Sequence, residues 1–196
     1  QTVAPKVIDL NATVEGMLKM LHRLIGEDIK IAWIPGEKVW PVIIDPGQVD
    51  QILANLCVNA RDAMGAHGRL VIETGNRVVT PEEAAAAPEA QAGEFVMLAV
   101  SDNGSGMSPE IMEHIFEPFF TTKPVGQGTG LGLAIVRDIV TGLGGEIGVT
   151  STAGQGSRFL IQLPLAEMPQ SERLLNEPTA ADAAAGVPCL ASEARA

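Results

Sequence analysis

The order of elements along the sequence predicts an α/β fold, with a layer of helices on one face of a mixed sheet. Paired strand-like segments alternate with single helix-like segments, which is the pattern expected when helices pack on one side of a sheet. The 196 residues fit one domain, and a hydrophobic fraction of 46% supplies enough apolar side chains for a core.

The first helix and the two strands after it follow from capping and periodicity. Asn11 is expected to cap the helix, and apolar residues at helical spacing extend it to about Ile25. Residues 30–34 and 39–44 are apolar or β-branched, so both are predicted to be short strands. A Pro-Gly pair between them predicts that a turn joins the two strands.

A second helix begins with a strong local signal. Asp45 is a suitable N-cap residue, and Pro46 is favoured at the first helical position. The helical pattern then continues to Met64, and Gly65 and Gly68 are expected to end it.

The second half of the chain combines hairpins with a long irregular segment. An Ala-rich insertion that begins at Thr80 separates two strands, and we expect its tip not to pack on the domain. Residues after Pro164 lack periodicity and aromatic side chains, and are predicted to be a disordered linker or tail. The predicted elements are strands at 69–79 and 94–101, a short helix at 109–115, a helix at 131–143 and a hairpin at 146–151 and 158–163.

Composition argues against several classes of function. The net charge is −11, whereas nucleic-acid and anionic-membrane surfaces need concentrated Lys and Arg, so we expect no nucleic-acid partner and no direct membrane contact. No apolar run approaches the roughly 18 residues of a membrane span, and the first residues show no signal-peptide pattern. Cys57 and Cys189 lie far apart and outside any CxxC motif, which favours a reducing, cytoplasmic setting.

Glycine is concentrated in one part of the chain, because twelve of the 21 Gly lie between Gly104 and Gly156. The run GQGTGLG, which ends at Gly132, has neither the dinucleotide-binding spacing nor the P-loop spacing. It does lead into a predicted helix, and free backbone N–H groups at a helix start favour an anion. A flexible hinge is the alternative reading of an isolated Gly-rich loop.

The motif DNGSGM places a carboxylate next to residues without side chains. Asp102 ends an apolar strand, and Gly104 and Gly106 follow it. Such a carboxylate can accept a hydrogen bond from a flat ligand that rests on the backbone. A surface turn is the alternative, because Asp-Asn-Gly is ordinary turn chemistry.

Asn55 and Asn59 lie four residues apart and share a face of the second helix. Asn is unfavourable inside helices, so this pair requires an explanation. Amide oxygens are suitable ligands for Mg²⁺, while capping or helix–helix contacts are the structural alternative.

Four motifs then occur in one order: NLCVNARDAM, DNGSGM, FEPFFTTK and GQGTGLGLAIV. Together they resemble the catalytic ATP-binding domain of sensor histidine kinases, within the GHKL family of Bergerat-fold ATPases and kinases. The resemblance extends from Asp9 to about Leu165. It implies a two-layer α/β (α+β) sandwich, in which about three helices cover one face of a mixed, mostly antiparallel sheet. The implied domain is 5–166, with an ATP lid near 103–130 and a linker or tail at 167–196.

The resemblance also assigns roles to individual residues, with ATP and Mg²⁺ as the expected cofactors. Asn59 matches the Mg²⁺-binding Asn, and Asn55 is its companion one turn earlier, expected to support the ion without direct contact. Lys123 is the only Lys or Arg between Asp102 and the fourth motif, and it is assigned to the β- or γ-phosphate. Asn59 and Lys123 are therefore the candidate catalytic residues. Asp102 matches the carboxylate that binds the adenine amine, supported through water by Ser157.

The remaining assignments follow from the same motifs, and of the three Phe only Phe120 is a candidate contact to ATP. Three glycine-motif residues shape the adenine pocket, two apolar residues form its walls, three Phe form an aromatic box at the root of the lid, and backbone groups of the fourth motif meet the phosphates. They are, in that order, Gly104, Gly106 and Met107; Ala63 and Ile115; Phe116, Phe119 and Phe120; and Gly128, Thr129, Gly130 and Leu131.

The expected reaction depends on the residue four positions before the Mg²⁺-binding Asn. Hydrolases of the family resembled have a general-base Glu there, whereas this chain has Asn55, whose amide cannot accept a proton from attacking water. ATP hydrolysis is therefore disfavoured, and phosphoryl transfer to a nucleophile that needs little activation, such as a histidine imidazole, is favoured.

The expected acceptor is a histidine outside this sequence. None of His22, His67 and His114 lies in an H-E-L-x-x-P context, so the resemblance implies a separate dimerisation and phosphoacceptor domain, with a response regulator or receiver domain downstream. The alternative is a non-catalytic nucleotide-sensing module that orders its lid for a protein partner.

Overall fold

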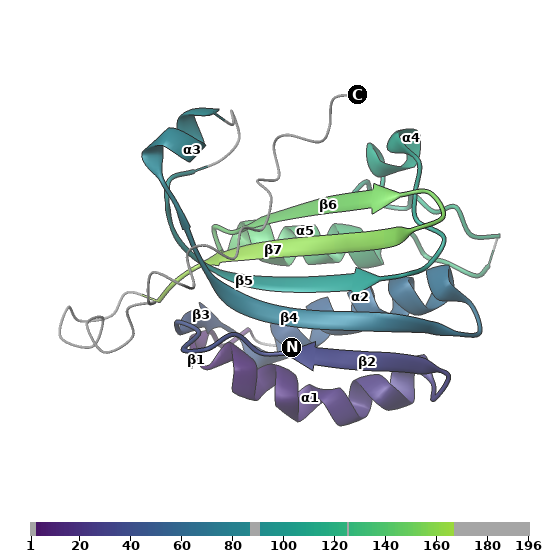
Figure 1. Cartoon of the computed structure of the whole chain (residues 1–196), viewed down its shortest axis with the longest axis horizontal. Helices are drawn as coiled ribbons and strands as arrows, with labels where there is room; N and C mark the ends of the chain where they lie inside the picture. The colour runs from purple at the N-terminus through teal and green to yellow at the C-terminus, as the bar shows by residue number, and fades with distance from the viewer. Residues whose placement is uncertain (1–2, 87–90, 125, 167–196) are drawn as a thin grey trace.

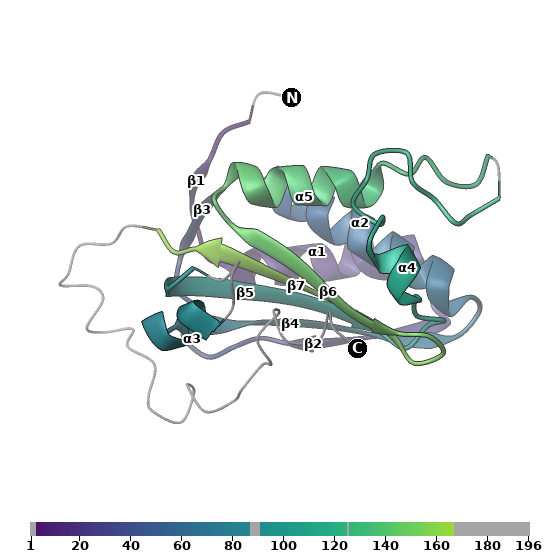
Figure 2. The same cartoon turned by 90° about the horizontal axis from the view of Figure 1, so that it is seen from above.

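A five-stranded sheet with helices on one face is the main feature of the computed structural model, which describes residues 3–86, 91–124 and 126–166 (Figure 1 and Figure 2). The predicted linker or tail at 167–196 lies outside these described residues. The strands, in their order across the sheet, are β2 (Ile29–Ile34), β4 (Gly68–Val79), β5 (Gly93–Asp102), β7 (Gly156–Pro164) and β6 (Glu146–Thr152). The covering helices are α1 (Leu10–Ile25), α2 (Pro46–Met64) and α5 (Gly132–Gly142).

The strand pairing agrees with the predicted fold class. β2 pairs with β4 in parallel, and the β4–β5, β5–β7 and β6–β7 pairs are antiparallel. The sheet is therefore mixed and mostly antiparallel, as predicted. In the β5–β7 pair Asp102 lies opposite Ser157, so two candidate site residues meet where β5 ends and β7 begins.

Helix α1 has a different N-cap from the one predicted. Asp9 is the N-cap, and its side chain accepts a hydrogen bond from the backbone N–H of Ala12 (3.2 Å). Asn11 lies inside the first turn, where its side-chain amide donates to the Gly36 carbonyl and accepts from the Thr74 hydroxyl. The prediction of Asn11 as the cap is wrong because contacts distant in sequence use its amide.

The two strands predicted at 30–34 and 39–44 do not form one hairpin. The second is shorter, β3 (Val42–Ile44), and it pairs antiparallel with β1 (Lys6–Ile8) in a separate two-stranded ribbon. The first, β2, lies at the edge of the main sheet. β1 has only three residues and was not predicted, since so short a run carries no clear periodicity.

Helix α2 begins as the sequence predicts, and one of its two predicted stop residues is correct. The Asp45 side chain accepts from the Gly47 N–H (2.8 Å), and Pro46 occupies the first turn. The helix ends at Gly65, but Gly68 begins strand β4 rather than terminating the helix. Its buried residues, which include Leu53 and Leu56, pack in the core between the helices and the sheet.

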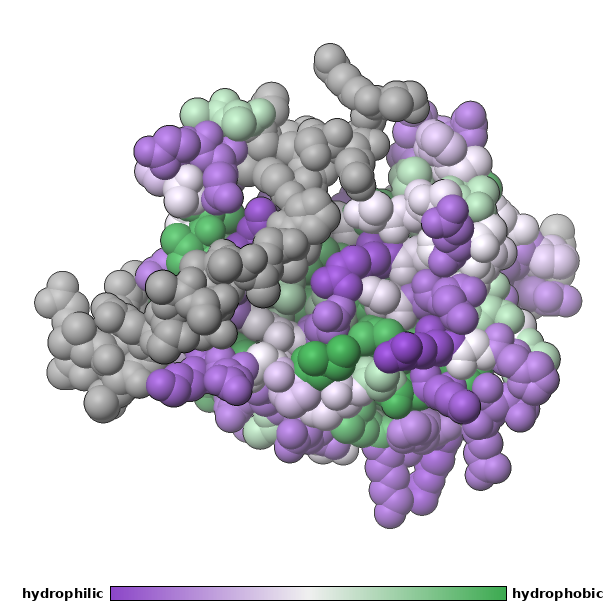
Figure 3. All heavy atoms as spheres, in the orientation of Figure 1, coloured by the Kyte–Doolittle hydropathy of each residue, from purple (hydrophilic) through white to green (hydrophobic). Residues whose placement is uncertain are grey.

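The remaining elements differ modestly from expectation. The Ala-rich insertion forms a short helix, α3 (Pro81–Ala86), which was not predicted, although no residue of α3 is buried. α4 (Pro109–Met112) is shorter than the predicted helix at 109–115. No described helix is long and apolar enough to cross a membrane. On the face of the sheet opposite α1, α2 and α5, the described residues are a mixture of hydrophilic and hydrophobic types (Figure 3).

Candidate functional site

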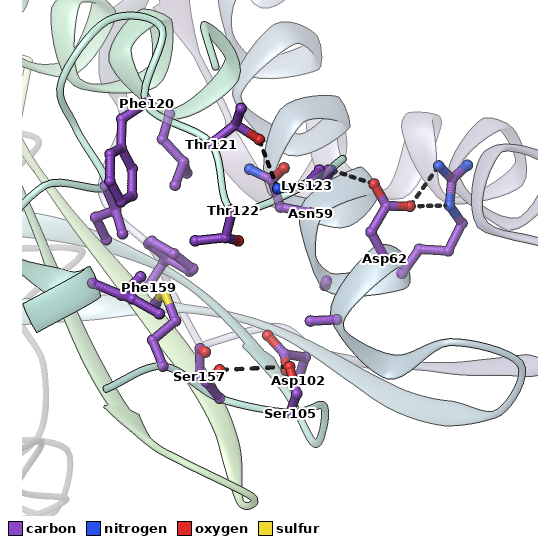
Figure 4. A pocket seen from close by; sticks show the side chains of 18 of the residues that line it. Asn59, Asp62, Asp102, Ser105, Phe120, Thr121, Thr122, Lys123, Ser157 and Phe159 are labelled. Atoms are coloured by element: carbon purple, nitrogen blue, oxygen red, sulfur yellow. Dashed lines mark hydrogen bonds and ion pairs between the residues drawn. The ribbon is translucent and has the colours of Figure 1, made fainter. Parts of the chain in front are cut away.

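A cavity of about 770 Å³ lies beside the C-terminal half of α2, next to the end of β5, the start of β7 and the segment after β5 (Figure 4). Apolar walls with a few convergent polar groups are typical of a small-molecule site. The apolar lining residues include Ala63, Met107, Ile111, Ile115, Phe120, Leu133 and Phe159, and the polar ones include Asn59, Asp62, Asp102, Ser105, Thr122, Lys123 and Ser157.

Asp102 is an oriented, half-buried hydrogen-bond acceptor at one end of this cavity. Its carboxylate accepts from the backbone N–H of Gly104 (2.8 Å), and the backbone N–H of Ser157 also bonds to it. Burial raises the pKa of the Asp102 carboxyl, and these two hydrogen bonds only partly offset that effect. The Asp102 carboxylate is therefore an acceptor in the cavity, and two backbone N–H groups fix its orientation.

Gly104 is required where it stands because α2 passes close to it. A Cβ at this position would lie 2.7 Å from the backbone carbonyl of Ala63. The neighbouring Ser105 N–H donates to the same Ala63 carbonyl (3.0 Å). The loop after β5 is thus held directly against α2.

The opposite side of the cavity in Figure 4 carries an amide and an ion pair. Asn59 lines the cavity from α2, and Asp62 follows it on the same helix. The Lys123 ammonium group is paired with Asp62, and Nε and Nη2 of Arg61 both donate to Asp62 Oδ1 (2.9 and 2.7 Å). Burial alone would raise the pKa of Asp62, but the hydrogen bonds from Lys123 and Arg61 outweigh it and lower that pKa.

Within the segment between β5 and α5, Phe119 and Gly130 close a loop by pairing their backbones. The Phe119 N–H donates to the Gly130 carbonyl (2.9 Å), and a Cβ on Gly130 would lie 2.3 Å from the Phe119 backbone. Phe119 has a positive φ of 67° and its side chain is 74% exposed. Phe116 and Phe120 pack against the core instead. Two of the three Phe therefore anchor this segment through their rings, and Phe119 does so through its backbone.

Comparison with known proteins identifies the family. Residues 44–167 match the family model described as histidine kinase-, DNA gyrase B-, and HSP90-like ATPase. The chain belongs to this family. Sensor kinase CckA of Brucella abortus (strain 2308) is 40% identical over 183 residues, which are 93% of this chain and 18% of that protein. Sensor histidine kinase ZraS of Escherichia coli (strain K12) is 34% identical over 164 residues, 83% of this chain and 32% of that protein.

The chain is also similar to solved structures. Full-length ShkA in complex with AMPPNP has a TM-score of 0.66 at 28% identity, covering 85% of this chain and 32% of that one. The catalytic domain of histidine kinase ThkA has a TM-score of 0.62 at 26% identity, covering 83% of this chain and 96% of that one. The chain is an ATP-binding catalytic domain of the sensor histidine kinase type, and it spans less than a third of the curated relatives described above.

The histidine kinase domain brings together most of the site residues that the sequence singled out. Those that line the cavity are Asn59, Ala63, Asp102, Gly106, Met107, Ile115, Phe120, Lys123 and Ser157. Those that do not line it are Asn55, Gly104, Gly128, Thr129, Gly130 and Leu131. Asn55 lies instead against the start of α5, where a Cβ on Gly132 would be 3.4 Å from its Oδ1.

Helix α5 starts beside this site without a side-chain cap. Its N-cap residue is Leu131, whose side chain makes no capping hydrogen bond. The first N–H groups of the helix therefore donate no bond to a cap side chain, which is the condition under which a helix start favours an anion. Phosphate binding by the backbone of the fourth motif therefore stays a prediction.

Sequence reasoning missed several residues of the domain that the structure places in or beside the cavity, and three of them bear on its chemistry. Asp62 follows Asn59 by three residues, a spacing that puts both on one helical face and could have identified it. Phe159 follows Ser157 by two residues in β7 and also lines the cavity. Ser151 of β6 is hydrogen-bonded to the Met107 N–H, and this contact between distant segments has no sequence signal.

Proposed function

We propose that this chain binds Mg·ATP in the cavity and transfers the γ-phosphoryl group to a histidine on a separate dimerisation and phosphoacceptor domain. The polarity of the cavity carries this proposal. A fixed acceptor, Asp102, stands at one end, and an amide with a nearby cation, Asn59 and Lys123, stands at the other. ATP has the matching order of groups, with an amine donor on the base and anionic oxygens on the phosphates.

The base end is suited to adenine. Asp102 accepts a hydrogen bond from the exocyclic amine, and Ser157, its partner across the β5–β7 pair, lies beside it. Apolar side chains such as Met107 and Ile115 line the same cavity and supply contacts for the faces of a flat base. Burial of the ring against these side chains contributes roughly 25 cal/mol per Å² of apolar surface removed from water.

The phosphate end is suited to a hard cation held jointly by protein and nucleotide. Among the described residues, no group of three or more His, Cys, Asp or Glu could hold a metal ion by itself. The Asn59 amide oxygen is a hard ligand, and Mg²⁺ typically takes one or two protein ligands together with phosphate oxygens. When bound, Mg²⁺ neutralises phosphate charge during transfer.

Lys123 can leave its partner for the phosphates at small cost. Exposed or half-exposed ion pairs contribute only about 0–1 kcal/mol, and the Asp62 carboxylate keeps Arg61 as a partner after Lys123 has moved. Lys123 then supplies positive charge at the β- or γ-phosphate. Backbone N–H groups of Gly128, Thr129, Gly130 and Leu131 are proposed to supply further donors.

Phosphoryl transfer at this site needs a nucleophile that attacks without the help of a general base. Asn55 stands where a general-base Glu would be needed, and its amide accepts no proton at neutral pH. A neutral imidazole forms the N–P bond with its lone pair while the bond from the γ-phosphorus to the ADP oxygen breaks. A response regulator or receiver domain then takes the phosphoryl group.

Transfer to an added acceptor tests this function. The chain alone is expected to bind Mg·ATP and to incorporate no γ-³²P label, whereas adding a domain with an H-E-L-x-x-P segment yields labelled acceptor. An acceptor with its histidine changed to Ala is the control. Rapid self-labelling, or steady ATP hydrolysis without a partner, would contradict the proposal. Tight ATP binding without transfer to any acceptor would instead support a nucleotide-sensing module.

Lys123→Ala is expected to bind ATP within about threefold of the wild type but to transfer roughly 10- to 100-fold more slowly. Removal of one charged donor at the developing transition-state charge costs about this much or more. Transfer rates at saturating ATP, together with calorimetric binding, measure the two effects separately. Lys19→Ala, an exposed change on α1, is the matched control.

A second variant separates the proposed phosphate contact of Lys123 from its ion pair with Asp62. Asp62→Asn removes the partner of Lys123 but leaves its charge. This variant should keep most of the transfer rate. An equal loss in Asp62→Asn and Lys123→Ala would show that the ion pair, and not phosphate contact, is what transfer requires.

A further inference from the structure

We propose that Ser151 sets the base selectivity of this site, by holding the hydroxyl proton of Ser157 away from the cavity. The inference rests on the proposed binding of adenine at the Asp102 end. Ser151 lies in β6, opposite Ser157 of β7 in the sheet register, and it does not line the cavity itself. It is therefore a positioning residue that acts through Ser157 and Met107.

Three contacts use the full hydrogen-bonding capacity of the Ser151 hydroxyl. Its Oγ accepts from the Met107 N–H (2.8 Å), lies 3.0 Å from the Gly156 carbonyl, and lies 2.9 Å from Ser157 Oγ. A serine hydroxyl has one proton and two lone pairs. A carbonyl can only accept, so the proton goes to Gly156. The two lone pairs then take the Met107 N–H and the Ser157 O–H.

This assignment fixes what Ser157 presents to a ligand. Its proton points toward Ser151, so only oxygen lone pairs remain on the side of the cavity that Ser157 lines. The Asp102 carboxylate beside it is also an acceptor. Asp102 and Ser157 therefore both accept hydrogen bonds from a ligand at this end and donate none. The Ser105 hydroxyl, which also lines the cavity, is directed to the Gly106 carbonyl (3.5 Å). A 6-amino purine satisfies the two acceptors, whereas the carbonyl of a 6-oxo purine would face lone pairs.

Backbone contacts hold the hairpin in place independently of Ser151. The Gly154 N–H at the β6–β7 turn donates to the Ser105 carbonyl (2.7 Å). A Cβ on Gly106 would lie 2.0 Å from the Thr152 carbonyl oxygen, so the loop and the hairpin touch directly. Loss of one hydroxyl should leave this packing intact, and Ser151→Ala is expected to fold.

The experiment compares ATP with inosine triphosphate, because the two differ only in the 6-amino or 6-oxo group and the proton on N1. Dissociation constants for both are measured by calorimetry on the full chain and on Ser151→Ala. In the variant the Ser157 hydroxyl is free to turn its proton into the cavity. We expect the preference for ATP over inosine triphosphate to fall roughly tenfold, with weaker ATP binding and stronger inosine triphosphate binding.

Three further variants make the test specific. Ser151→Thr keeps the hydroxyl and should restore the wild-type preference, and Thr150→Ala, an exposed change one residue away, should not alter it. Ser151→Ala added to Ser157→Ala should cause no further loss of preference, because it acts through the Ser157 hydroxyl. An unchanged preference in Ser151→Ala, or equal weakening of both nucleotides, would overturn the inference. Failure of the wild type to bind either nucleotide would refute the proposed function instead.

Discussion

Asp102→Asn is expected to weaken ATP binding by at least about 100-fold and to abolish phosphoryl transfer, without destabilising the folded domain. The carboxylate accepts from Gly104 and Ser157 and keeps acceptor capacity for the base. An amide at this position directs an NH₂ donor either at the donor groups of the protein or at the amine of adenine. A buried donor without an acceptor costs about 1–3 kcal/mol, and the lost bond to the base adds to it.

The stability of the same variant follows from the sign of the Asp102 pKa shift. Burial is the main cause that raises this pKa in the folded state. A folded-state pKa above the unfolded value means that the ionised form is disfavoured by folding. The contribution of the Asp102 carboxyl to stability is therefore fully present below the unfolded pKa, and it is lost as the pH rises through the raised folded pKa. At neutral pH the uncharged Asn variant should therefore melt at the same temperature as the wild type or slightly higher.

ATP binding and the Asp102 contribution to stability should consequently change in opposite directions on acidification. Protonation of Asp102 removes the acceptor, so ATP affinity should fall at a higher pH than an exposed carboxyl would give, while the Asp102 contribution to folding improves. Calorimetric ATP titrations of the wild type, and the difference in melting temperature between the wild type and Asp102→Asn from pH 4 to 7.5, measure the two effects. Asp138→Asn, an exposed change on α5, is the control. Wild-type ATP affinity in Asp102→Asn would rule out its role in base binding.

Local signals in the sequence predicted most of this fold, and contacts between distant segments account for the errors. Asp45 and Pro46 begin α2 as predicted, because a cap acts within one turn. Asn11 has the same capping chemistry, yet Gly36 and Thr74 take its amide, so Asp9 caps α1 instead. Strand partners depend likewise on tertiary structure, which is why β3 pairs with β1 rather than with β2.

The site shows the same division between local and distant information. Asp102 and Asn59, which the four motifs single out, both line the cavity. The ion pair of Lys123 with Asp62 joins residues 61 positions apart, and the contact of Ser151 with Met107 joins residues 44 apart. Neither has a signature in spacing or periodicity. Motifs therefore identified the groups proposed to touch the ligand better than the groups that hold them in position.

Asn59→Ala is expected to reduce phosphoryl transfer by roughly 100- to 1,000-fold, the range seen when one preorganised transition-state ligand is removed. The loss should come with a flattened dependence on Mg²⁺, because the amide oxygen proposed to hold the ion is gone, while binding of magnesium-free ATP changes little. Transfer rates over a Mg²⁺ titration, with ATP binding measured in the presence of EDTA, separate the two effects.

Asn55→Ala is the matched control for this experiment, because it removes the same group one turn earlier on the same helix. Asn59 lines the cavity, whereas Asn55 lies against Gly132 at the start of α5. If Asn55 supports the ion only indirectly, its loss should slow transfer by less than about tenfold and leave the Mg²⁺ dependence unchanged, since the direct ligand remains. Equal losses in the two variants would contradict the asymmetry, and would mean that both amides bind the ion directly once the segment between β5 and α5 closes on ATP.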